Sequence, residues 1–164
     1  MALRRLKMKK IYSIAAIMLI ICMLCACGTT AKVPDMQTVA DAVGAAMDIS
    51  EMSQTPDAYV ENVMSISSDS YSIRNTLISH VGTNINEYGI FLATDEDNAK
   101  AINEALEAYL DYRESLWMDE YLPDEKPKLD NAEVWQQGNF VMYVILGDED
   151  RAAVKSAFDS CFEG

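Results

Sequence analysis

Apolar residues recur at helical spacing immediately after residue 34. They follow one another at steps of three and four, which places them on one face of a helix over residues 35–48. The positions on this face are Met36, Val39, Ala40, Val43 and Met47. Asp35 is a good N-cap for this helix. A second, shorter helix is predicted to begin at Thr55-Pro56, because threonine caps helices well and proline is favoured in their first turn.

The period then changes from helical to alternating. Residues 71–81 are rich in β-branched and hydroxyl side chains and are predicted to form a strand. A turn at residues 82–84 and a second strand over residues 88–93 follow. A long helix over residues 95–118 comes next. Its stripe comprises Ala99, Ile102, Ala105, Leu106, Tyr109, Leu110, Arg113 and Leu116-Trp117.

The last part of the chain is predicted to contain a hairpin and a closing helix. The hairpin joins residues 134–136 to residues 140–146 through a turn at Gly138, and the helix covers residues 148–162. A loop with two prolines, residues 121–131, precedes the hairpin.

Two segments of this region resemble each other. Residues 90–99 and residues 143–152 each consist of an apolar strand, one small residue, Asp-Glu-Asp and the start of a helix. Two strand–strand–helix units of this kind build an α+β fold. The sequence therefore predicts a four-stranded, mostly antiparallel sheet with helices on one face. The candidate repeat is the strand–strand–helix unit, and two N-terminal helices precede it.

The start of the chain has the pattern of a bacterial lipoprotein signal. Five basic residues precede an apolar run of fourteen residues, and Ala26 stands before Cys27 at a cleavage site. We therefore expect a signal peptide over residues 1–26, a tether over residues 27–34 and a single α+β domain over residues 35–164. The thiol of Cys27 would carry a diacylglycerol, which places the protein at the cell membrane, lipid-anchored on the extracellular face.

The length of the apolar run favours cleavage over membrane spanning. Residues 11–24 form a helix of roughly 21 Å, at about 1.5 Å per residue. The hydrocarbon core of a bilayer is about 30 Å thick. The alternative interpretation is an uncleaved N-terminal anchor.

The charge of the chain excludes one class of partner. Five of the 13 basic residues and none of the 26 acidic residues lie in residues 1–26, so the remainder carries eight basic and 26 acidic side chains, a net charge of −18. A surface this acidic repels phosphate backbones, which excludes nucleic-acid binding. It also repels anionic lipid headgroups, so the two acyl chains on Cys27 must hold the protein to the membrane.

Catalytic and metal-binding patterns are sparse. His80 is the only histidine, whereas a zinc site needs three or four ligands and a catalytic triad needs a nucleophile and an acid near its base. Neighbouring strand residues such as Ser79 and His80 point to opposite faces. Cys161 lies on an apolar helix stripe and is predicted to be a core residue. The Asp-Glu-Asp runs fail the calcium-loop pattern and are predicted to begin helices. We expect no metal and no cofactor.

The candidate binding residues lie on the long helix, before it and after it: they are Arg113, Tyr112, Tyr121 and Glu87. Arg113 falls near the apolar stripe of a very acidic domain. It either forms a structural ion pair, with Glu87 or with an acid of residues 121–131, or binds a carboxylate. Tyr112 and Tyr121 belong to an aromatic-rich stretch and are candidates for stacking on a sugar ring or for contacting a partner protein.

The order of several short motifs resembles a known family. They are Glu87-Tyr88-Gly89-Ile90-Phe91, Arg113, Tyr121-Leu122-Pro123, Ala132-Glu133-Val134, Gly138-Asn139-Phe140-Val141 and Asp148. Over roughly residues 34–162 the chain is similar to Gram-positive bacterial lipoproteins that share a domain of unknown function, number four-three-five-eight. The resemblance implies an extracytoplasmic, lipid-anchored domain. It implies no activity and no catalytic residue.

Two functions from different classes are open. The first is a non-enzymatic binding or interaction module with an envelope protein as partner, which predicts an exposed aromatic or apolar patch on the sheet or around residues 121–131. The second is a small cell-envelope hydrolase, which predicts a pocket where His80 meets a nucleophile and carboxylates. The lack of a catalytic cluster in the sequence favours the first.

Overall fold

The computed structural model describes residues 33–118 and 120–163. The predicted cleavage site at Ala26 and Cys27 lies outside the described residues, as does most of the predicted tether. Among the residues described, no helix combines the length and the apolar character needed to cross a membrane. Residues Val33–Glu163 form a compact unit of their own.

Five antiparallel strands form one sheet. Their order across the sheet is β1-β2-β3-β5-β4, so the hairpin of β4 and β5 adds to the hairpin of β2 and β3 through β5. The strands are β1 Met52–Gln54, β2 Tyr71–Ser79, β3 Glu87–Ala93, β4 Glu133–Gln137 and β5 Phe140–Ile145. The predicted α+β class and antiparallel pairing are confirmed. The fifth strand was not predicted, because the three residues of β1 are too few to show an alternating pattern.

Five α-helices and one short 3-10 helix are present in the described part of the chain. They are α2 Met36–Ala45, α3 Asp57–Asn62, η1 Ser68–Ser70, α4 Glu96–Ser115, α5 Lys126–Asp130 and α6 Asp148–Ser160. Asp35 caps α2 as predicted, since its carboxylate accepts a hydrogen bond of 2.9 Å from the backbone N–H of Thr38. The second helix begins one residue later than predicted, with Pro56 and not Thr55 at the N-cap.

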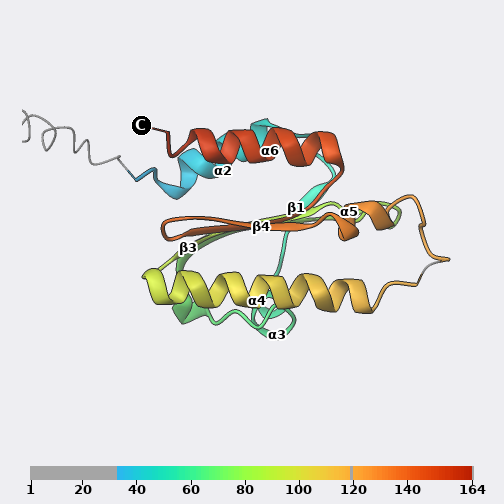
Figure 1. Cartoon of the computed structure of the whole chain (residues 1–164), viewed down its shortest axis with the longest axis horizontal. Helices are drawn as coiled ribbons and strands as arrows, with labels where there is room; N and C mark the ends of the chain where they lie inside the picture. Colours follow the sequence, from blue (N-terminus) through green and yellow to red (C-terminus); the bar gives the residue numbers. More distant parts are fainter. Residues whose placement is uncertain (1–32, 119, 164) are drawn as a thin grey trace, which may run out of the picture. The chain divides into compact units, whose positions relative to one another are not determined.

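The prediction of helices on one face of the sheet is wrong, because helices cover both faces. Figure 1 shows α2 and α6 on one side of the sheet and α4 with α3 on the other. The cause lies in the central strands: every residue of β5 and all but one residue of β3 are buried. A strand that is apolar at every position must be covered on both sides. The predicted order of strand, strand and helix does occur twice, but α4 and α6 lie on opposite faces.

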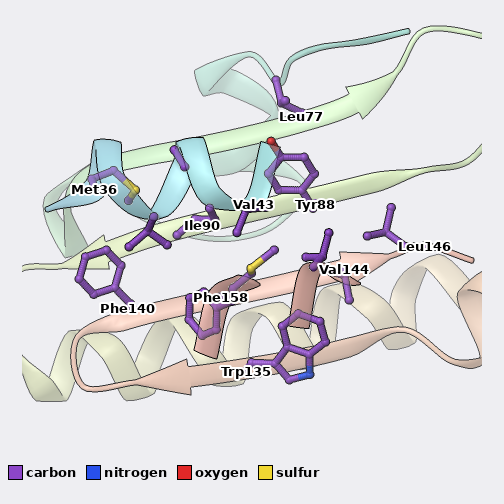
Figure 2. Packing of buried hydrophobic residues seen from close by; sticks show 14 residues of the cluster. Met36, Val43, Leu77, Tyr88, Ile90, Trp135, Phe140, Val144, Leu146 and Phe158 are labelled. Carbon is purple, nitrogen blue, oxygen red and sulfur yellow. The ribbon is translucent and has the colours of Figure 1, made fainter. Parts of the chain in front are cut away.

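The two faces carry separate apolar cores. Figure 2 shows the first, where α2 and α6 pack on side chains such as Tyr88 and Phe140 from the central strands. The second lies under α3 and α4 and contains Phe91 and Val141 from the same two strands. Successive residues of a strand point to opposite faces, so β3 and β5 supply both cores. The domain therefore holds enough buried apolar surface on each face to fix both helical layers.

Gly89 allows a close approach inside the second core. It pairs with Tyr143 across β3 and β5 and with Thr76 across β3 and β2. A Cβ atom at this position would lie 2.4 Å from Cε1 of Tyr143 and 2.7 Å from Cγ2 of Thr76. Glycine is therefore needed for the Tyr143 ring to lie across β3, and this placement carries the Tyr143 hydroxyl to the site described next.

Candidate functional site

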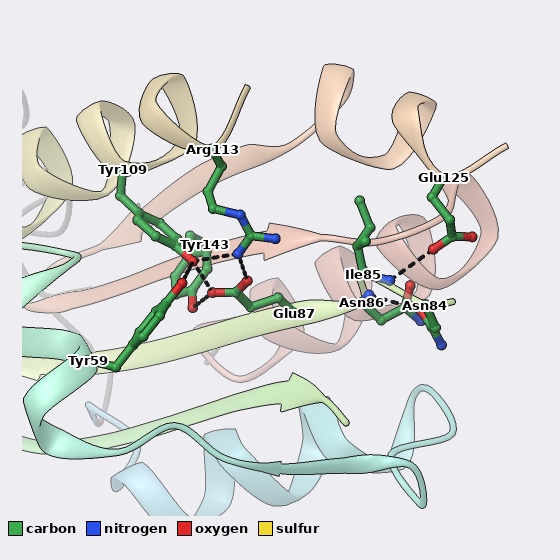
Figure 3. Close-up of polar contacts among 9 residues, drawn as sticks. All are labelled: Tyr59, Asn84, Ile85, Asn86, Glu87, Tyr109, Arg113, Glu125 and Tyr143. Carbon is green, nitrogen blue, oxygen red and sulfur yellow. Dashed lines mark hydrogen bonds and ion pairs between the residues drawn. The ribbon is translucent and has the colours of Figure 1, made fainter. Parts of the chain in front are cut away.

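A buried carboxylate organises the polar part of the second core. Glu87, the first residue of β3, is fully buried. Its Oε1 accepts hydrogen bonds from the hydroxyls of Tyr109, at 2.6 Å, and Tyr143, at 2.7 Å. Its Oε2 forms an ion pair with the guanidinium of Arg113 (Figure 3). The charge is thus both hydrogen-bonded and paired, which is the condition under which a buried carboxylate persists.

Four elements, β3, α4, β5 and α3, bring these groups together. Tyr109 and Arg113 are four residues apart on α4 and therefore lie on one face of the helix. Tyr143 comes from β5, and Tyr59 of α3 contacts the Tyr109 hydroxyl at 2.9 Å. The Tyr109 hydroxyl has one proton, which goes to Glu87, so it accepts from Arg113 at 2.7 Å and from Tyr59. Tyr59 is accordingly the donor to Tyr109.

The helix α5 fixes the turn that leads into Glu87. The carboxylate of Glu125 accepts a hydrogen bond of 2.9 Å from the backbone N–H of Ile85 (Figure 3). The same carboxylate pairs with the ammonium of Lys128 at 2.7 Å. This contact holds the segment before β3 against α5. It falls in residues 121–131, which the sequence predicted to be a loop without a helix.

The charge states of the site follow from burial and from the carboxylate. Burial, reinforced by the Glu87 charge, raises the pKa of the Tyr143 and Tyr109 phenols far above their usual value. Burial alone would lower the pKa of Arg113, but Glu87 and Tyr109 outweigh it and raise that pKa. At neutral pH the two phenols are therefore neutral donors and Arg113 is charged. The arrangement holds a carboxylate and a guanidinium in place inside the fold.

Alkaline titration provides a test of this burial. Burial raises the pKa of Tyr88 to about 12, and it also raises the pKa of Tyr109 and that of Tyr143. Because each folded-state pKa exceeds the unfolded value of about 10, the stabilisation is complete below pH ~10 and is lost above it. We expect the free energy of unfolding to fall by about 1.4 kcal/mol per pH unit for each buried phenol. Urea unfolding at increasing pH, followed by phenolate absorbance, measures this loss; a constant free energy through the same range would contradict it.

The structure contains the ion pair between Arg113 and Glu87, which was one of the alternatives for Arg113. A binding role for these two residues stays a prediction. The sequence did not indicate Tyr59 or Tyr143 as partners. Tyr109 was assigned to the buried stripe, which is correct, since its exposed fraction is 2%.

His80 makes no side-chain hydrogen bond or ion pair within residues 33–118 and 120–163. It is exposed just beyond β2, and its backbone N–H donates to the carbonyl of Glu51 at 3.1 Å. The neighbouring Ser79 hydroxyl accepts from the backbone N–H of Val81. Within residues 33–118 and 120–163, no three His, Cys, Asp or Glu side chains come together as metal ligands. Cys161 is half-buried against the first core, and burial raises the pKa of its thiol.

Exposed apolar residues lie close together in the sequence around the end of α4. We call the following four residues the α4-end patch: Tyr112, Leu116, Met118 and Tyr121, with exposed fractions of 48%, 59%, 64% and 53%. Tyr112 and Tyr121 were predicted binding candidates, whereas Leu116 was placed on the buried stripe. That placement is wrong because α4 ends at Ser115 and Leu116 is its C-cap. The Tyr121 hydroxyl donates to the carbonyl of Gly82 at 3.3 Å.

An open pocket lies between α3 and α4. It encloses about 380 Å³, and its lining includes Val63 and Met64 after α3 and Ala108 on α4. The rings of Tyr109 and Tyr112 complete one side. Tyr112 thus belongs to both the pocket and the α4-end patch. Tyr109 also joins the pocket to the Glu87 site.

The comparisons with known proteins give a family but no function. A family model described as a domain of unknown function (DUF4358) matches residues 45–146, which is more than half of the 164-residue chain. No curated protein and no solved structure matches this chain.

Proposed function

The chain belongs to the DUF4358 family, and we propose that it is a non-enzymatic binding module tethered by lipid to the extracellular face of the cell membrane. The anchoring half of the proposal rests on the first 27 residues, where basic residues, an apolar run and Ala26-Cys27 follow one another. The remainder of the chain has a net charge of −18 and is repelled by an anionic membrane. The lipid on Cys27 therefore supplies the attachment.

The binding half of the proposal is carried by one observation, the clustering of exposed apolar side chains. Of the six large hydrophobic residues exposed in the described chain, the four of the α4-end patch lie within ten residues of one another. Isolated exposed apolar residues are ordinary, whereas a cluster with a polar surround is typical of an interaction site. The surrounding residues Glu114, Glu120 and Asp124 are exposed acids.

The position of the patch suits a partner outside the membrane. In Figure 1 the described chain begins next to α2 at one end of the sheet, and α4 ends at the opposite end of the sheet. A tether that enters beside α2 leaves the α4-end patch at the far end of the domain. The patch would then face away from the bilayer and toward other envelope components.

Site-specific crosslinking in intact cells tests the binding role. A photo-reactive amino acid replaces Leu116 in the patch, and the same amino acid replaces Ile73, a 48% exposed apolar residue of β2, as the matched control. We expect a discrete crosslinked species from position 116 and none from position 73. Equal crosslinking from both positions, or none from either, would refute the α4-end patch as a binding surface.

A further inference from the structure

We propose that the pocket between α3 and α4 receives a single bulky apolar side chain of a partner polypeptide in which lysine or arginine flanks that side chain. This inference rests on the proposed binding function and specifies the chemistry that the partner presents. It concerns the open pocket, which shares Tyr109 with the Glu87 site; the chain's own groups fill the Glu87 site itself.

The pocket exists because α4 carries small side chains opposite α3. Four residues of α4 line the pocket: Ala105, Ala108, Tyr109 and Tyr112. Their spacing of three, one and three residues places them on one face of the helix. The two alanines leave space that longer side chains would fill. The resulting volume of about 380 Å³ is at the lower end of the range of ~300–1,000 Å³ typical of ligand pockets. It is therefore large enough to receive one bulky side chain.

The lining suits an apolar group, and the rim suits a cation. Exposed acids lie next to lining residues on both walls: Glu61 precedes Asn62 on α3, and Glu104 precedes Ala105 on α4. The one ion pair that an exposed base makes with this rim, between Lys100 and Glu104 at 3.8 Å, is solvent-exposed and weak. Charge complementarity therefore favours a partner with basic residues around an apolar anchor.

The pocket continues into the α4-end patch. Tyr112 belongs to both, and Leu116 follows it by four residues, one turn further along the same face. A segment that inserts an anchor beside Ala108 would reach the patch by running along α4. Buried anchors surrounded by near-neutral contacts are the usual arrangement at protein interfaces. The same acids oppose contact with an anionic membrane, which argues against a lipid surface as occupant.

A synthetic peptide with one phenylalanine between pairs of lysines is the probe for this site. Two matched peptides have alanine in place of the phenylalanine or glutamate in place of the lysines. Each peptide is titrated into residues 27–164 in the Cys27→Ser form, of which Val33–Glu163 form a compact unit with its own cores. Changes in amide NMR shifts identify the residues that the peptide contacts. Ala108→Leu fills the pocket, and Ala153→Leu, at an exposed position of α6, is the control.

We expect the lysine–phenylalanine peptide to shift the amides of Met64 and Tyr112 and to bind at least tenfold more weakly to Ala108→Leu. Ala153→Leu should bind as the parent does, added salt should weaken binding, and neither matched peptide should bind. Equal binding of the alanine peptide, or binding unaffected by Ala108→Leu, would overturn the proposal. No binding of the lysine–phenylalanine peptide would overturn it as well. If crosslinking from position 116 succeeds while this peptide fails, the binding function stands and only the chemistry proposed for the pocket is wrong.

Discussion

Replacing Arg113 by alanine is expected to lower the free energy of unfolding by about 3–5 kcal/mol, the usual cost of removing one partner of a buried ion pair. Glu87 has no exposed surface, whereas the Arg113 side chain is 20% exposed. The substitution therefore leaves a carboxylate without a counter-charge in the second core. The Tyr109 and Tyr143 hydroxyls still donate to it, but two neutral donors do not replace a guanidinium.

Two further variants make this test specific. Lys100→Ala removes an ion pair whose side chains are both largely exposed, and we expect it to cost less than ~1 kcal/mol. Glu87→Gln keeps a side-chain oxygen that accepts from Tyr109 and Tyr143. The group that it leaves without a counter-charge is the guanidinium of Arg113, which is partly exposed to water. Glu87→Gln should therefore cost less than Arg113→Ala. Urea denaturation followed by circular dichroism gives all three free energies; equal costs for Arg113→Ala and Lys100→Ala would show that the buried pair does not stabilise the fold.

Replacing Cys27 by serine is expected to release the protein from the membrane. Serine has no thiol to carry the diacylglycerol, and the chain after residue 26 has a net charge of −18, which anionic lipid headgroups repel. We expect labelled palmitate to enter the parent protein and not the Cys27→Ser variant. Cell fractionation should show the parent in the membrane fraction.

Cys161→Ser is the matched control for this experiment. Cys161 lies in the last turn of the chain, half-buried against the first core, where its thiol donates to the carbonyl of Ala157 at 3.3 Å. The variant should incorporate palmitate and remain in the membrane fraction. Palmitate on the Cys27→Ser variant, or loss of palmitate from Cys161→Ser, would contradict lipid attachment at Cys27.

The sequence predicted the elements whose signals are local. Helix α2 has a capping aspartate and an apolar stripe, and β3 and β5 are apolar runs bounded by turns, so each shows its nature within a dozen residues. Strand β1 and helix α5 have three and five residues and are formed through contacts with distant segments. Helices cover both faces because the run Phe140–Ile145 is apolar at every position. The prediction of helices on one face did not use this lack of alternation.

The sequence predicted only those residues of the candidate site that stand out within a single helix or strand. Arg113 stood out because a cation beside an apolar stripe needs a partner, and Glu87 was one of those considered. Tyr59 and Tyr143 reach the site through α3 and through the pairing of β3 with β5, which bring together residues far apart in the chain. The exposure of Leu116 depended on α4 ending at Ser115, a boundary that hydrophobic periodicity does not fix.

The most direct test of lipid tethering is the mass of the N-terminal peptide of the protein isolated from cells. A tethered binding module requires a polypeptide that starts at Cys27 and carries a diacylglycerol on that residue. We predict this peptide as the dominant N-terminal species, recovered from the membrane fraction. An unmodified polypeptide that retains residues 1–26 would contradict the account.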